Sequence, residues 1–101
     1  MSQFLTQQEI LRLLANHQAQ IKTFGVRSLA LFGSFAHGDY TAHSDVDLVV
    51  HFDTKSFDAY MDLKFFLEDL LSRRVDLVPT DSVKPRLRKS ILEDAVHVPG
   101  L

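Results

Sequence analysis

A chain of 101 residues has room for one small domain, and we predict a single domain over residues 1–101. Its net charge of −2 argues against a nucleic-acid partner, and its lack of cysteine excludes disulfides, zinc–thiolate sites and thiol nucleophiles. No apolar run approaches the roughly 20 residues that span a membrane, and no signal peptide is recognisable, so we expect a cytoplasmic protein without a membrane partner.

The first predicted element is a helix that begins after Thr6 and ends near Gly25. Thr6 and Glu9 have the spacing of a capping box, with Phe4 or Leu5 as the apolar residue before it. Apolar residues at helical spacing predict that this helix packs against the core: Ile10, Leu11, Leu13, Leu14, Ala15 and Ile21.

A short apolar strand is predicted over Val26–Phe32, and a glycine turn follows it. Gly33 permits a sharp turn and lets a ligand approach the main chain closely. Ser34 can cap a short helix that Gly38 ends, and a helix N-terminus offers free N–H groups to phosphate. We therefore predict that Gly33 and Ser34 form a phosphate-binding turn.

A second strand is predicted over Asp45–Phe52. Its alternation places four residues on a core face: Val46, Leu48, Val50 and Phe52. The other face carries Asp45, Asp47, Val49 and His51. Because Asp is depleted in strands, two acids in an otherwise apolar strand indicate function. Two carboxylates beside a phosphate-binding turn suit Mg²⁺ bound to a nucleoside triphosphate.

The longest predicted helix covers residues 56–73. Its apolar side chains are interpreted as a buried face rather than a base-stacking platform: Phe57, Tyr60, Leu63, Phe66, Leu67, Leu70 and Leu71. Arg73 and Arg74 would close the helix with charge that suits its C-terminal dipole.

A third strand, Val75–Pro79, again contains an acid, Asp76. Asp76 is either a functional carboxylate or a structural one paired with Arg73 or Arg74.

The last predicted helix begins at the basic segment Lys84–Lys89, with Pro85 in its first turn. Four cations there oppose the helix dipole. They form a solvated face, or they bind the triphosphate or an acidic partner. The apolar face of this helix is predicted to contain Ile91, Leu92 and Ala95, and Val96–Pro99 is expected to add an edge strand.

The Gly33-Ser34 turn followed after ten residues by Asp45-x-Asp47 resembles the signature of the nucleotidyltransferase superfamily, which has the fold of the DNA polymerase β catalytic domain. Nearly the whole chain resembles the minimal nucleotidyltransferases, or MNT domains, the antitoxin partners of HEPN toxins. The resemblance implies an α/β (α+β) fold with a small mixed sheet and helices packed against it. His37 departs from the Arg that many relatives have there.

The resemblance also implies site roles. Asp45 and Asp47 would be catalytic and would hold Mg²⁺, with two ions expected, while Asp76 would complete the metal site and help deprotonate the acceptor. Gly33 and Ser34 would bind the β- and γ-phosphates of ATP. The implied reaction transfers AMP to a tyrosine of a HEPN toxin and silences it. Because no segment forms an evident small-molecule acceptor pocket, we expect a protein acceptor.

Three alternatives remain open. The chain could be an inert module that neutralises its partner by binding alone, although retention of the three acids argues against this. It could transfer a nucleotide to a small molecule, which predicts turnover without a protein partner. It could be another Asp-x-Asp enzyme, such as a glycosyltransferase, although the preceding Gly-Ser argues against this. Whether the protein forms a homo-oligomer is not indicated by the sequence.

Overall fold

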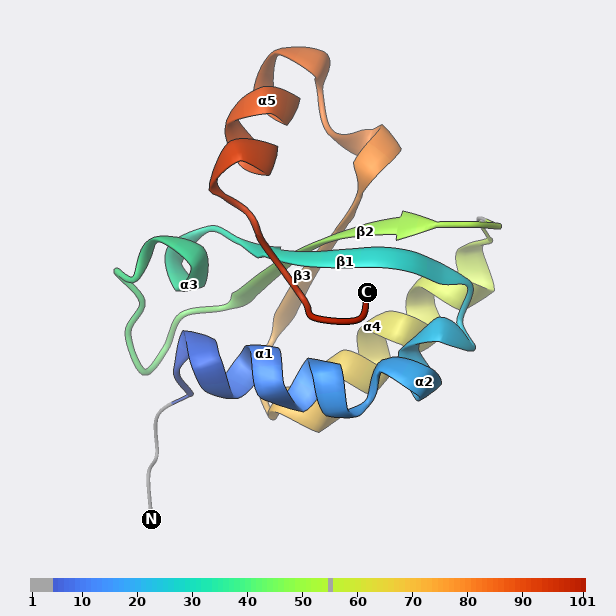
Figure 1. The fold of residues 1–101 in the computed structure, drawn as a ribbon, viewed down its shortest axis with the longest axis horizontal. Coiled ribbons are helices and arrows are strands. Elements are labelled where there is room, and N and C mark those ends of the chain that lie inside the picture. The colour runs from blue at the N-terminus through green and yellow to red at the C-terminus, as the bar shows by residue number, and fades with distance from the viewer. Residues whose placement is uncertain (1–4, 55) are drawn as a thin grey trace.

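A computed structural model describes residues 5–54 and 56–101 as a four-stranded mixed sheet with helices on both faces (Figure 1). This arrangement confirms the predicted fold class. The elements in chain order are α1 (Gln7–Asn16), α2 (Gln18–Lys22), β1 (Val26–Phe32), α3 (Ser34–His37), β2 (Val46–Phe52), α4 (Phe57–Leu71), β3 (Val75–Pro79), the 3₁₀ helix η1 (Thr80–Ser82), α5 (Pro85–Asp94) and β4 (Val96–His97).

The strands lie in the order β3-β2-β1-β4. β2 pairs antiparallel with β1 and parallel with β3, and α4 makes the crossover that a parallel pair requires. β4 pairs antiparallel with β1 at the other edge, so the expected edge strand over residues 96–99 is confirmed for its first two residues. In the described ranges, no helix is both long and apolar enough to cross a bilayer.

The main core lies between one face of the sheet and the helices α1, α2 and α4, which Figure 1 shows on the same side. Its fully buried side chains include Ile10, Leu14, Ile21, Leu29, Leu31, Leu48, Val50, Leu63 and Leu67. The predicted alternation of β2 is therefore confirmed. Val49 points to the opposite face but is also buried, because Val83 and the α5 region cover part of that face.

The N-terminal helix is capped as predicted, since Thr6 Oγ1 accepts a hydrogen bond from the Glu9 backbone N–H at 3.1 Å. It does not run unbroken to Gly25. It is interrupted at His17, the C-cap of α1. Nδ1 of His17 lies 2.8 Å from the Leu13 carbonyl oxygen, so the side chain satisfies a carbonyl group in the last turn of the helix. Leu5 packs against the core, whereas Phe4 lies outside the described residues.

Two predictions about α4 are wrong. Phe57 is 76% exposed rather than buried. It precedes Leu63 by six residues, which places it about 120° around the helix from that buried side chain. The helix also ends at Leu71, because Ser72 has a left-handed φ of 51°, and so Arg73 and Arg74 lie beyond it. In α5, similarly, Leu92 is exposed while Ile91 packs on the sheet.

Side chains of α4 cover the edge of β3. The Tyr60 hydroxyl donates to the Leu77 carbonyl oxygen at 2.7 Å, and Glu68 Oε2 accepts from the Val75 N–H at 3.0 Å. Pro79 has no N–H to offer. In a parallel edge strand, the backbone N–H and C=O groups of alternate residues point away from the sheet. Tyr60 and Glu68 occupy such groups and Pro79 lacks an N–H, so this edge is less able to pair with a strand of another chain.

Candidate active site

Gly33 connects β1 to α3 with φ 71° and ψ −149°, a conformation that favours glycine. A Cβ at Gly33 would stand 3.0 Å from Cγ and 3.2 Å from Cβ of Asp47. The reason is the strand register, which pairs Phe32 with Asp47 across β1 and β2. Glycine is therefore needed twice here, for the backbone conformation and for space beside the Asp47 carboxylate.

The short helix after the turn begins at Ser34 and ends at His37, and Gly38 caps it with a φ of 88°. The prediction that Ser34 caps this helix is wrong, because Gly33 occupies the N-cap and Ser34 is already helical. At the other end, Gln7 Nε2 donates to the carbonyl oxygens of Phe35 and Ala36 at 3.0 and 3.2 Å, which ties α3 to the start of α1.

The three acids lie at one end of the sheet. Asp47 in β2 is directly opposite Asp76 in the parallel strand β3. Asp45 was expected to begin β2, but the strand starts at Val46, whose N–H donates to the Arg74 carbonyl oxygen at 3.0 Å and opens the ladder. Asp45 and Asp76 are exposed, whereas Asp47 is half-buried.

The electrostatics of this cluster are concentrated on Asp47. Burial raises the pKa of the Asp47 carboxyl above its usual value, and the charges of Asp76 and Asp45 raise that pKa further. The structural alternative for Asp76 is not supported: among the described residues, no ion pair joins it to Arg73 or Arg74. The acids therefore repel one another with no basic side chain paired to Asp76.

The donor set fits a hard divalent cation, since all three groups are carboxylates and their mutual repulsion is what such an ion relieves. Over residues 5–54 and 56–101, however, no three acidic or histidine side chains already converge closely enough to hold a metal ion. The fold brings the acids to one end of two adjacent strands without gathering them around a common point.

Residues 14–98 match the protein family described as the nucleotidyltransferase domain. The chain belongs to this family. It is 38% identical to the protein adenylyltransferase MntA of Thermococcus cleftensis, over 93% of this chain and 97% of that protein. This membership excludes the glycosyltransferase alternative.

Two solved structures are similar to this nucleotidyltransferase. One, provisionally described as a minimal nucleotidyltransferase, has a TM-score of 0.81 and 30% identity, over 91% of this chain and 95% of that one. The other, a toxin–antitoxin crystal structure with AMP-PNP, has a TM-score of 0.68 and 25% identity, over 86% of this chain and 73% of that one.

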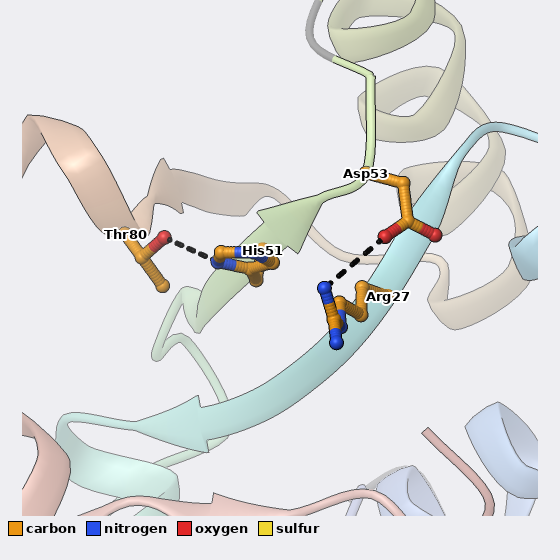
Figure 2. A network of polar contacts seen from close by, with 4 residues as sticks. All are labelled: Arg27, His51, Asp53 and Thr80. Carbon is orange, nitrogen blue, oxygen red and sulfur yellow. Dashed lines mark hydrogen bonds and ion pairs between the residues drawn. The ribbon is translucent and has the colours of Figure 1, made fainter.

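His51 of the nucleotidyltransferase lies toward the far end of β2 from the acids. Figure 2 shows its ring directed at Thr80 of η1, with Nδ1 3.1 Å from Thr80 Oγ1. At the same end, Arg27 Nη1 lies 3.7 Å from Asp53 Oδ1 (Figure 2). His51 is exposed, and its contact with Thr80 lies apart from the three acids.

The basic segment Lys84–Lys89 also lies away from the Gly33 turn. Arg88 Nη2 donates to the Thr80 carbonyl oxygen at 3.3 Å, which places the N-terminal half of α5 beside η1. The opposite end of α5 lies beside α3, where His37 Nε2 is 3.7 Å from Asp94 Oδ2. All residues of the basic segment are exposed, which favours a solvated face over a contact with phosphates at Gly33.

Proposed function

We propose that this nucleotidyltransferase is an antitoxin that transfers AMP from ATP to a tyrosine hydroxyl of a cognate HEPN toxin and thereby silences it. The observation that carries the proposal is the cluster of Asp45, Asp47 and Asp76 beside Gly33. The chain also corresponds along nearly its full length to a protein adenylyltransferase, and a similar structure is a toxin–antitoxin complex with an ATP analogue.

In this proposal the three acids hold Mg²⁺, and Gly33 and Ser34 hold the β- and γ-phosphates. When bound, the metal neutralises phosphate charge and favours in-line displacement. Asp76 is the exposed acid of the strand pair and takes the proton of the incoming hydroxyl. A bond forms between the tyrosine oxygen and the α-phosphorus, the α–β phosphoanhydride bond breaks, and pyrophosphate leaves.

The electrostatics of Asp47 favour an enzyme over an inert binding module. Burial and two neighbouring like charges raise the pKa of the Asp47 carboxyl, which destabilises the fold at neutral pH and so indicates a functional requirement. A module that neutralises its toxin by contact alone has no need of this arrangement.

The proposal is tested by incubating the protein with a cognate HEPN toxin, ATP and Mg²⁺ and measuring the intact mass of the toxin. We expect the toxin to gain the mass of one or more AMP units. Asp47→Asn should abolish the gain, whereas Asp53→Asn, an exposed acid at the far end of β2, should retain it. Silencing without a mass change, and equally by Asp47→Asn, would mean neutralisation by binding. Turnover with a small acceptor alone would favour that alternative.

A further inference from the structure

Two side chains that the sequence did not connect with the site contact the residues just before two of the proposed catalytic acids. Arg73 Nη1 donates to the Ser44 carbonyl oxygen at 2.9 Å, and Ser44 precedes Asp45. Glu68 Oε2 accepts from the Val75 N–H at 3.0 Å, and Val75 precedes Asp76. Both contacts are partly buried, and both come from the end of α4 or the turn after it.

The Arg73 side chain is held in place by more than this hydrogen bond. Its guanidinium carbon lies 5.9 Å from the centroid of the Phe35 ring, on the helix that follows Gly33. Phe35 is fully buried and stacks on Tyr40 with ring centroids 4.4 Å apart, so it is a fixed platform. A planar guanidinium can stack on this platform while donating to Ser44, which an ammonium group cannot do as well.

The backbone beside Arg73 completes the connection. The Val46 N–H donates to the Arg74 carbonyl oxygen at 3.0 Å, so Asp45 is flanked by two bonds that lead to residues 73 and 74. Asp45 itself lies outside the β ladder. The main chain at Asp45 is therefore held in place by the turn between α4 and β3. Asp76 follows Arg74 of the same turn by two residues.

We propose that Arg73 and Glu68 are positioning residues that fix the main chain beside Asp45 and Asp76, so that both carboxylates can reach a cation held by Asp47. This inference rests on the proposed function, because it assigns the three acids to a cation. Residues that orient metal ligands through hydrogen bonds typically change metal affinity by about 10–100-fold when they are removed. We therefore expect Arg73→Ala and Glu68→Ala each to weaken cation binding by about tenfold or more.

The test measures Mn²⁺ binding in the presence of AMP-PNP, by the loss of the free Mn²⁺ signal in electron paramagnetic resonance. Arg74→Ala and Asp69→Ala are matched controls, because both side chains are exposed and each adjoins a positioning residue. Arg73→Lys and Glu68→Gln keep a donor or an acceptor and should recover part of the affinity, and they remain informative if an alanine variant unfolds.

Hydrogen exchange of the metal-free protein gives a second readout. We expect faster exchange at the Val46 amide in Arg73→Ala and at the Val75 amide in Glu68→Ala, with both unchanged in the controls. Mn²⁺ affinities of Arg73→Ala and Glu68→Ala equal to those of their controls would overturn the inference. Normal Mn²⁺ binding without adenylylation would refute the proposed function alone, and absence of Mn²⁺ binding by the unaltered protein would refute both.

Discussion

Among single residues, Asp47 lies in an environment that disfavours its ionised form. Its carboxyl is half-buried against Gly33 and near two other carboxyls, so its pKa is raised in the folded state, chiefly by burial. A raised pKa means that the folded protein binds this proton more tightly than the unfolded chain does. Ionised Asp47 therefore destabilises the metal-free fold, and the penalty appears as pH rises from the ordinary value of 3.8 through the raised pKa.

Asp47→Asn should accordingly raise the melting temperature of the metal-free protein near pH 7 while lowering transfer activity by about 10²-fold or more. The gain in stability should vanish as the pH is lowered below 3.8, because the native carboxyl is then protonated. Thermal melts across this range test the sign, with Asp53→Asn as the exposed control. An unchanged or lower melting temperature near pH 7 would contradict the electrostatic argument.

Gly33→Ala should destabilise the fold by about 1–3 kcal/mol through backbone strain, with a further contribution from overlap with Asp47. Gly38→Ala separates the two effects, since Gly38 also has a positive φ but a Cβ there would meet nothing within 4 Å. Adding Asp47→Ala should recover more stability in the Gly33 variant than it adds in the Gly38 variant or in the unaltered protein. Denaturant unfolding of the double-mutant cycles measures this coupling, and strict additivity at Gly33 would refute the overlap.

At the scale of elements, the bounds of β1 and β3 were predictable because each is a short apolar run with its own flanking signals. The errors lie where a distant contact decides. Arg73 looked like a partner of the helix dipole, but it reaches a carbonyl 29 residues away in the chain. No sequence pattern pointed to Glu68, which accepts a hydrogen bond from the Val75 N–H. The three acids proposed for the site were selected from local sequence pattern, whereas the hydrogen bonds that Arg73 and Glu68 make beside them could not be inferred from it.

Tyr60→Phe tests the covered edge of β3. Loss of the 2.7 Å hydrogen bond to the Leu77 carbonyl oxygen should lower the free energy of unfolding by about 1 kcal/mol. Tyr40→Phe is the matched control, because Tyr40 contributes its ring to the stack on Phe35 and that stack is kept. Equal stability of the Tyr60 and Tyr40 variants in urea unfolding would show that the edge does not depend on this bond.

For the whole molecule, the main core and the acids occupy opposite faces of the sheet. Fold and site are thus separable: the apolar face supplies stability, and the acidic end reduces it. In the proposed function, a bound cation relieves this loss. Mutations in the site should therefore change how stability responds to ligands more than whether the chain folds.

This separation predicts that ligands reverse which protein melts at the higher temperature, the unaltered protein or Asp47→Asn. Without metal, Asp47→Asn should melt above the unaltered protein, because it removes the repulsion at the acidic end. With saturating Mg²⁺ and AMP-PNP the unaltered protein should melt above the variant, since a ligand at about 100 times its dissociation constant adds about 2.7 kcal/mol to the folded state. Removal of Mg²⁺ with EDTA should again make Asp47→Asn melt above the unaltered protein. Scanning calorimetry of both proteins under the three conditions measures this, with Asp53→Asn expected to follow the unaltered protein throughout. If Mg²⁺ and AMP-PNP raise the melting temperature of Asp47→Asn as much as that of the unaltered protein, the cation does not bind at Asp47.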